Sequence, residues 1–438
     1  MSRVAHCGSI LHFRADPGTH DSPDAFEYWE QGALIVAAGR IEAVGPAAAL
    51  LRAASGELTI IDHGERLLMP GFIDTHIHYV QTDVIASGGQ NLLEWLERYT
   101  FPAEQRFADP QHAHGVAEFF LDELLRNGTT SAQVLATVHK SSVDAFFEVA
   151  AARGLRMIAG KTLMDRNCPP EWIQSPAAGE REMRELIERW HGRDRLHYAI
   201  TPRFAPTSSV AQLDSAGRLA REYPDVFIHS HLAETRAEIH WVRELFPDTR
   251  SYLDVYDRFG LLRERATYAH CIYLDDADRR RLAGSGAGAA FAPSSNLYLG
   301  SGLFDLEASD AAGMRYALAT DVGGGSSFSM LRTMAEAYKV AHLLGQSLPP
   351  LRAFYLSTLA GARMLGLADK IGHFVPGAEA DFIVLDPQAT PLLARRMAQA
   401  RTLSERLLLY MILGDDRAIA ATFILGQRAQ PATRTVAV

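Results

Sequence analysis

Strand-like apolar runs alternate with helical patterns through most of the 438-residue chain. These runs lie at 71–78, 128–137, 156–165, 196–204, 226–234, 267–271, 289–296 and 316–322. Alternation of this kind is typical of parallel strands joined by helical crossovers, and eight such units are the number that closes into a (β/α)8 barrel. Because such barrels carry their chemistry at the carboxyl ends of the strands, functional side chains are expected where these runs end.

Both ends of the chain add strands outside the predicted barrel. Residues 33–46 predict two short strands around an Ala38-Gly39 turn, and 377–386 and 422–426 predict strands near the other end. A chain of 438 residues also exceeds the usual size of a single hydrophobic core. We therefore expect an α/β fold: a (β/α)8 TIM-type barrel over 67–371 and a small β-sandwich domain built from 1–66 and 372–438.

Composition excludes several classes of partner. The net charge of -9 comes from 52 acidic and 43 basic residues that are mixed along the chain, without the basic stripe that nucleic-acid binding needs. Cys7, Cys168 and Cys271 form no CxxC pair and are odd in number, which favours free thiols in a reducing compartment. No window approaches the roughly 18 apolar residues of a membrane span. These features predict a soluble cytoplasmic protein that binds neither nucleic acid nor membrane.

Side chains suited to metal or acid–base chemistry stand at the ends of the predicted barrel strands. They are His76 and His78, Arg203, His231 with Glu234, His270, and Asp321. His76 and His78 lie two residues apart on one strand, so both imidazoles leave the same face. Three histidines and an aspartate would form a mononuclear site with room for a water, whose pKa zinc can bring to about 7. Glu234 is placed to accept and pass on the proton of that water.

The alternative, purely structural interpretation is that each histidine is a packed, hydrogen-bonded core residue. This is the usual case for a single histidine on an apolar strand. The pattern His-x-His, His-x-x-Glu, His and Asp, at four strand ends in chain order, favours one site instead. His229 precedes His231 by two residues and faces the same way, but one layer deeper. We expect it to support the ligands or the core instead of binding metal.

Five segments carry a family resemblance that covers nearly the whole chain. They are Asp74–Asp83, Leu93–Glu104, Thr201–Phe204, Ser230–Glu234 and Ser295–Gly302. Together with the flanking strands, the barrel motifs resemble the amidohydrolase superfamily, and the local sequences closely resemble its guanine deaminase family.

The resemblance implies a zinc-dependent hydrolytic deamination of guanine to xanthine and ammonia, a step of purine catabolism, by a homodimeric enzyme. Residues that would bind one zinc ion per subunit are His76, His78, His231 and Asp321. Glu234 and His270 would be catalytic, and Asp321 would also orient the water. The purine would be held by Gln81, Arg203 and Phe204, beside His231, His270 and Asp321. Whether zinc or iron occupies the site in the cell stays open.

The residues themselves support parts of this assignment. The fourth predicted strand ends in Ile200-Thr201-Pro202-Arg203, without the lysine that bridges two metals in many relatives, so a single metal is expected. The guanidinium of Arg203 suits a substrate carbonyl, since its fixed fork of donors matches planar acceptors. Trp95 is equally suited to stacking on the purine and to ordinary helix packing. Gly323–Gly325 fit either a close backbone approach to the pocket or a plain loop.

The sequence is also compatible with other functions. Val80 and the Leu135-Ala136 pair depart from the family pattern, which leaves fine substrate preference open. A related deaminase that acts on 8-oxoguanine, a pterin or a triazine would keep the same metal residues. The unrelated zinc nucleobase deaminases need Pro-Cys-x-x-Cys after His-x-Glu, and none follows His63-Gly64-Glu65. A metal-binding or storage module is disfavoured because Glu234 and His270 accompany the ligands.

Overall fold

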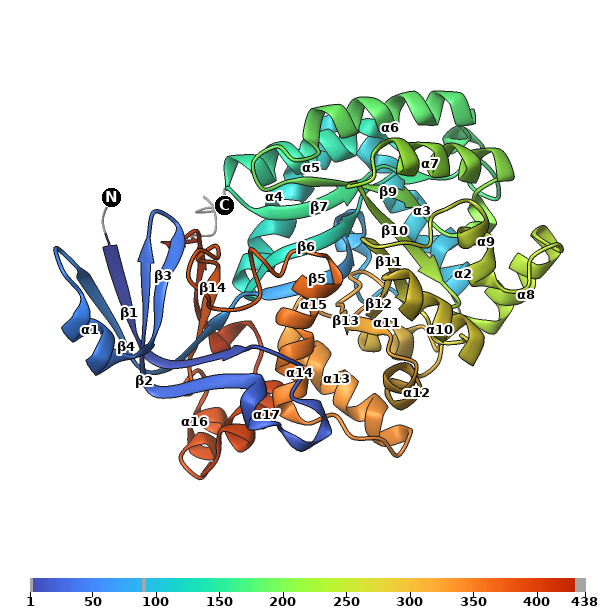
Figure 1. Ribbon diagram of the computed structural model, residues 1–438. Helices are drawn as coiled ribbons and strands as arrows, with labels where there is room; N and C mark the ends of the chain where they lie inside the picture. The colour runs from blue at the N-terminus through green and yellow to red at the C-terminus, as the bar shows by residue number, and fades with distance from the viewer. Residues whose placement is uncertain (1–2, 89–91, 430–438) are drawn as a thin grey trace.

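The computed structural model describes residues 3–88 and 92–429, which form a parallel barrel beside a smaller mixed sheet (Figure 1). The barrel strands are β5 (Phe72–His78), β6 (Thr129–Leu135), β7 (Arg156–Gly160), β9 (His197–Pro202), β10 (Phe227–Leu232), β11 (Ala266–His270), β12 (Gly288–Phe291) and β13 (Arg315–Leu318), with β8 (Thr162–Leu163) paired to β9. All the predicted runs therefore form parallel strands in chain order, which confirms the barrel.

The barrel closes between its first strand and the chain that follows its last. The amide of Asp321 donates to the carbonyl of His76 at 3.0 Å, and the amide of His78 donates to the carbonyl of Val322 at 2.9 Å. The side chain of Thr75 adds a hydrogen bond to the carbonyl of Leu318 at 3.0 Å. This closure brings Asp321 beside the His-x-His pair, although the two lie far apart in sequence.

The last two barrel strands are much shorter than the apolar runs that predicted them. The run 289–296 ends as a strand at Phe291, and helix α11 (Pro293–Tyr298) begins with Pro293, whose fixed φ and missing N–H suit the first turn of a helix. The run 316–322 ends as a strand at Leu318, so Asp321 lies on the loop beyond β13 and not within the strand. The apolar composition of these segments reflects burial of a loop and a helix start, which periodicity alone does not distinguish from a strand.

Helices surround the barrel (Figure 1). They are α4 (Pro110–Arg126), α5 (Lys140–Ala152), α6 (Pro176–Trp190), α7 (Val210–Glu222), α8 (Arg236–Leu245), α9 (Tyr252–Arg258), α10 (Asp276–Ser285), α12 (Leu306–Ala311), α13 (Met330–Leu343), α14 (Pro350–Leu356) and α15 (Leu359–Met364). In α4, Ala113, Ala117, Phe120, Leu121 and Leu124 recur three or four residues apart and are fully buried. This spacing makes the apolar stripe that holds the helix on the barrel.

Segments from both ends of the chain form the second sheet, in the order β16-β15-β14-β4-β1-β2-β3. Its strands are β1 (Arg3–Phe13), β2 (Phe26–Ala37), β3 (Arg40–Pro46), β4 (Thr59–Pro70), β14 (Phe382–Leu385), β15 (Ile419–Ile424) and β16 (Gln427–Arg428), with α1 (Ala47–Ala53), α16 (Pro391–Met397) and α17 (Leu403–Leu413) nearby. Ala38 and Gly39 both have positive φ, as a two-residue hairpin turn requires, which confirms the predicted hairpin.

The terminal sheet is continuous and wraps around its own core. Ile10, Leu34, Leu68, Phe382 and Phe423 come from five different strands and belong to one buried cluster. A small β-domain built from both termini is therefore confirmed. Only Gly71 separates β4 from the first barrel strand, and the exact division at residues 67 and 371 stays a prediction.

Gly160 marks a place where two barrel strands leave no space for a side chain. A Cβ added at Gly160 would lie 1.7 Å from the carbonyl oxygen of Ala199, which is backbone and cannot move aside cheaply. Gly160→Ala is therefore expected to cost about 1–3 kcal/mol or more, measured by urea unfolding. Gly115→Ala is the matched control, because no atom lies within 4 Å of its added Cβ on α4. Equal stability of the two variants would contradict this account.

A buried ion network joins the barrel to the terminal sheet. The Nε of Arg156 on β7 donates to Oε2 of Glu379 at 2.8 Å, Arg195 Nη2 lies 2.8 Å from the same oxygen, and Arg195 also pairs with Asp381. Burial alone would raise the pKa of Glu379, but Arg156 and Arg195 hold it below its ordinary value. The folded protein therefore favours the ionised form of Glu379.

Removing the Glu379 carboxylate takes the ion pair from the buried guanidinium of Arg156 and leaves Arg195 with its pair to Asp381. Glu379→Gln is expected to lower the free energy of unfolding by about 3–5 kcal/mol, the usual cost of breaking a buried ion pair. Urea unfolding measures it, with Glu336→Gln, which breaks an exposed pair to Lys339, as the control. A Glu379→Gln variant as stable as this control would show that the network contributes nothing to joining the two parts.

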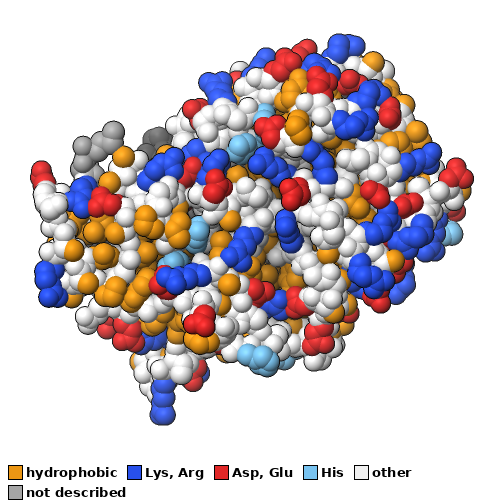
Figure 2. Space-filling view, viewed as in Figure 1, with side chains coloured by type: hydrophobic (Ala, Val, Ile, Leu, Met, Phe, Trp, Pro, Cys, Tyr) orange, Lys and Arg blue, Asp and Glu red, His pale blue; other side chains and the backbone are white. Residues whose placement is uncertain are grey.

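The surface of the protein mixes both signs of charge. On the face drawn in Figure 2, Lys and Arg side chains alternate with Asp and Glu, and no continuous basic stripe crosses that face. Among the described residues, no helix combines the length and apolar character needed to cross a bilayer. Cys7, Cys168 and Cys271 are free cysteines.

Candidate active site

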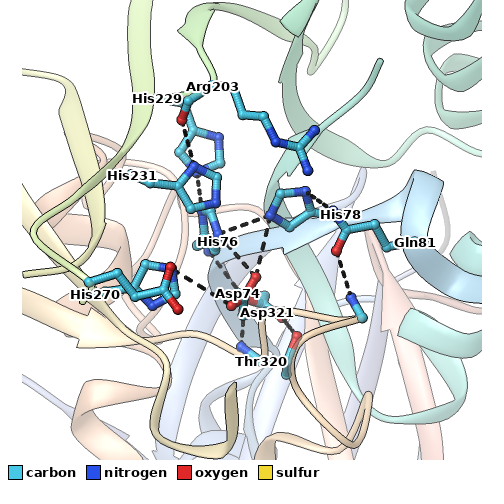
Figure 3. Close-up of polar contacts among 12 residues, drawn as sticks. Asp74, His76, His78, Gln81, Arg203, His229, His231, His270, Thr320 and Asp321 are labelled. Carbon is cyan, nitrogen blue, oxygen red and sulfur yellow. Dashed lines mark hydrogen bonds and ion pairs between the residues drawn. The ribbon is translucent and has the colours of Figure 1, made fainter. Parts of the chain in front are cut away.

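The carboxyl ends of the barrel strands bring the predicted site residues together. Figure 3 shows His76 and His78 of β5, His231 of β10, His270 of β11 and Asp321 pointing toward one another. His76 is 0% exposed and Asp321 5% exposed. The cluster is therefore a buried group of imidazoles around one carboxylate.

The distances in this cluster are those of a potential metal centre. Asp321 Oδ1 lies 3.1 Å from His76 Nε2 and 3.4 Å from His78 Nε2, and these two nitrogens lie 3.2 Å apart. The potential ligand atoms of His76, His78 and Asp321 lie within 4.8 Å of one another, and so do those of His76, His231 and His270. Neutral histidines with a carboxylate are donors that zinc accepts in catalytic sites.

The outer nitrogens of the histidines have partners of their own. His231 Nδ1 lies 2.6 Å from the carbonyl of Arg203, which can only accept, so this nitrogen carries the proton and Nε2 is left as a lone pair. His76 Nδ1 lies 2.7 Å from His229 Nε2. His229 is fully buried and sits one layer below the cluster, which is the position that the sequence predicted. Its supporting role stays a prediction.

Burial sets the protonation states of the cluster. It lowers the pKa of His76 to about 4 and that of His231 well below its ordinary value, so both imidazoles are neutral near pH 7. Burial alone would raise the pKa of Asp321, but His76 and His78 hold it well below its ordinary value. Neutral imidazoles and an ionised carboxylate are the forms that bind metal, so the residues present fit a zinc ion.

A second carboxylate stands beside His270. Glu234 Oε2 lies 3.5 Å from His270 Nε2, and Ser301 Oγ donates to Glu234 Oε1 at 2.7 Å. Burial raises the pKa of Glu234, which favours a group that can both take and return a proton. Burial would lower the pKa of His270, but Glu234 and Asp321 raise it above its ordinary value. A charged His270 is suited to stabilising a developing negative oxygen.

Unusual backbone conformations aim these side chains into the barrel mouth. His270 and Asp321 have positive φ values of 71° and 51°, a region that residues other than glycine rarely adopt. The following glycines allow close packing: a Cβ at Gly324 would lie 2.7 Å from Ser295 Oγ, and one at Gly325 would lie 1.8 Å from the carbonyl oxygen of Thr320. Of the two interpretations of Gly323–Gly325, close backbone approach is the one supported.

A small pocket opens over the cluster, with about 30 Å³ of free volume. Its lining comprises His78, Gln81, Leu92, Trp95, Leu96, Arg203, Phe204, His231, Glu234, Glu238, His270, Leu299, Asp321 and Gly324. Every residue predicted to hold a purine therefore lines it. Trp95 is 2% exposed, packs with Val84 and Leu96, and donates from Nε1 to the carbonyl of Ser87 at 3.1 Å. Trp95 thus serves packing and also forms part of the wall.

Several polar residues of the site were not predicted. Glu104 contacts Arg203 and Gln81, and Glu238 lines the pocket. Asn296 Oδ1 lies 2.9 Å from His270 Nδ1, and the hydroxyl of Ser301 contacts Glu234. Glu104, Asn296 and Ser301 belong to segments that carry the family resemblance, but no spacing rule marks them as site residues. Glu238 lies four residues after Glu234, and its carboxylate accepts from the amide of Glu234 at 2.9 Å. The sequence signal that could have identified Glu238 is the capping box at the start of α8, in which Thr235 and Glu238 stand three residues apart.

Comparisons with known proteins place the chain in a family. Residues 67–429 match the model of the Amidohydrolase family. The chain is 46% identical over 413 residues to a guanine deaminase of Escherichia coli (strain K12), which covers 93% of this chain and 94% of that protein. A solved structure of E. coli guanine deaminase matches with a TM-score of 0.95 and 44% identity, covering 99% of this chain and 100% of the other. One from C. acetobutylicum with bound guanine matches with a TM-score of 0.88 and 27% identity, over 98% and 100%.

Proposed function

The chain belongs to the guanine deaminase family of the amidohydrolases, and from this premise we propose that it hydrolyses guanine to xanthine and ammonia. The observation that carries the proposal is a pocket lined by Glu234, by Arg203 and by two members of the potential metal cluster, His78 and Asp321. These groups supply, within one cavity, a metal centre, a proton carrier and a donor for a ring carbonyl. The protein is accordingly a hydrolase that acts on a carbon–nitrogen bond of a cyclic amidine.

His76, His78, His231 and Asp321 would hold one zinc ion per subunit. Bound there, the ion would supply a water whose pKa is lowered to about 7, so that a nucleophile is available at neutral pH. The support for four ligands is the buried convergence of His76, His78 and Asp321, with the lone pair of His231 Nε2 fixed by the contact of Nδ1 to the Arg203 carbonyl.

The other residues move protons and stabilise charge. The reaction forms a bond from the water oxygen to C2 of guanine and breaks the bond from C2 to its amino nitrogen. Glu234 accepts one proton from the water and delivers it to a ring nitrogen next to C2. It then takes the proton of the new C2 hydroxyl group and gives it to the amino group, which leaves as ammonia while the C2 carbonyl forms. His270, 3.5 Å from Glu234, stabilises the oxygen as the carbonyl of xanthine forms, and Asp321 orients the water.

Recognition of the purine falls to Gln81, Arg203 and Phe204, which line the pocket beside the histidines. The fork of Arg203 suits the ring carbonyl, since its donors are planar and permanently charged. Gln81 contributes an amide whose Nε2 lies 3.1 Å from His78 Nδ1, so it sits between substrate and metal centre. Phe204 is 5% exposed and lines the same pocket, where it offers a face for the ring.

The cellular setting is part of the proposal. Free cysteines and the absence of a basic stripe on the drawn face fit a cytoplasmic enzyme of purine catabolism that handles a small molecule. The family resemblance supports a homodimer, and light scattering of the purified protein would test that state.

Turnover of a panel of bases tests the function. The metal-replete protein is incubated with guanine, 8-oxoguanine, adenine, cytosine and a pterin, while ammonia release and purine absorbance are followed. Guanine is expected to be converted fastest. A preference for 8-oxoguanine or a pterin would keep the chemistry and replace the substrate. Metal binding without turnover of any base would overturn the enzyme assignment in favour of a binding module.

A further inference from the structure

Glu104 is a buried carboxylate behind the wall that recognises the substrate. Its side chain is 0% exposed and lies in α3 (Phe101–Gln105), which follows a π-helix at Leu96–Thr100. Arg203 Nη1 donates to Oε1 at 3.0 Å and to Oε2 at 2.8 Å, and Gln81 Nε2 donates to Oε1 at 3.0 Å. One carboxylate therefore holds both polar groups proposed to bind the purine.

The contacts require a carboxylate and not merely a polar group. Both neighbours present N–H donors, and an ionised carboxylate only accepts. Because Arg203 Nη1 contacts both oxygens, an amide at position 104 would direct its own N–H donors at Arg203 or at both neighbours, whichever way it was turned. It would also leave the guanidinium, 3% exposed, without a buried counter-charge.

The same short helix fixes Arg203 from a second side. The guanidinium carbon of Arg203 lies 5.6 Å from the ring centre of Phe101, within the range of a cation–π contact. Gln81 is fixed at its other end as well, because its Oε1 accepts from the amide of Gly323 at 3.3 Å. Glu104 is thus the shared anchor of two side chains that come from opposite parts of the barrel mouth.

We propose that Glu104 is a positioning residue that sets the specificity of the pocket for a purine bearing a carbonyl at C6. It acts through Arg203 and Gln81, by fixing the donors of both and by neutralising the buried charge of Arg203. This inference rests on the proposed function, in which Arg203 reads the ring carbonyl. Glu104 does not line the pocket itself, so a change at this position should affect substrate recognition and not the proton transfers.

Glu104→Gln tests the proposal in the zinc-loaded enzyme. We expect KM for guanine to rise by about tenfold to a hundredfold, the scale of losing a hydrogen bond to a charged group, while kcat changes little. Discrimination between guanine and 2-aminopurine, which lacks the C6 carbonyl, should fall by a similar factor. Zinc content, measured by elemental analysis, should stay at the wild-type value. Glu97→Gln is the matched control, since Glu97 lies on the preceding π-helix and is exposed.

A double-mutant cycle with Arg203→Gln separates positioning from general damage. If Glu104 acts through Arg203, adding Glu104→Gln to Arg203→Gln should change KM and discrimination far less than it does in the wild type. Multiplicative losses, or wild-type KM and discrimination in Glu104→Gln, would overturn the proposal. Should Glu104→Gln fail to fold, Glu104→Asp keeps the charge but draws the carboxylate back from Arg203 and Gln81, and unaltered KM and discrimination there would also overturn it. A wild-type enzyme inactive on guanine would instead refute the proposed function.

Discussion

Dialysis against a strong chelator is expected to abolish deamination and to lower the temperature of unfolding, and added zinc should restore both. The reason is that a group of histidines and one carboxylate, with Asp321 Oδ1 3.1 Å from His76 Nε2, has no catalytic nucleophile of its own. An ion that binds only the folded state also stabilises it, by about 4 kcal/mol at a thousandfold excess over its Kd. Elemental analysis, calorimetry and ammonia release together measure the effect.

Point variants test whether zinc binds at this cluster. His78→Ala removes one proposed ligand, so the variant should purify with little zinc and stay inactive at zinc concentrations that restore the wild type. His342→Ala, an exposed histidine of α13, is the control and should bind zinc as the wild type does. Full turnover by a metal-free protein, or undiminished zinc in His78→Ala, would refute a metal centre at these residues.

The parts of this site that could be predicted share one property: they follow strands whose apolar pattern is visible in the sequence. His76 and His78 lie in the last three residues of β5, His231 is one residue before the end of β10, and His270 ends β11, so barrel geometry brings them together. Asp321 was found by its position near the end of the last predicted run, 316–322, although the strand itself ends at Leu318 and Asp321 lies beyond it on a loop with positive φ.

Glu104 could not be predicted because nothing local marks its role. It lies in a helical insertion after β5, and its partner Arg203 is 99 residues away at the end of β9. Only folding of that insertion over the barrel mouth makes the contact. Ser301 is similar, since its hydroxyl reaches Glu234 across 67 residues from a loop without regular structure. Sequence periodicity reports which face of an element is buried, but not which distant polar group meets it there.

The replacement Glu234→Gln should separate metal binding from proton transfer. The side chain keeps its size and its hydrogen bond to Ser301, but an amide cannot accept the proton of the water and return it to the leaving group. We expect kcat to fall by about 10² to 10⁴, the usual contribution of a general acid–base group, while KM and zinc content change little. Steady-state kinetics with guanine and elemental analysis of the same preparation measure these quantities.

The pH dependence of the wild type identifies the same group. Burial raises the pKa of Glu234 above its ordinary value of 4.5, so the ionised form that accepts a proton is lost at a higher pH than for an exposed glutamate. Turnover should therefore decline as the pH falls through that raised pKa. Ser301→Ala, which removes a hydrogen bond that lowers this pKa, should shift the decline to higher pH without abolishing turnover. If Glu234→Gln retained near wild-type kcat, proton transfer would have to pass through another residue, and His270 or Asp321 would be the nearest candidates.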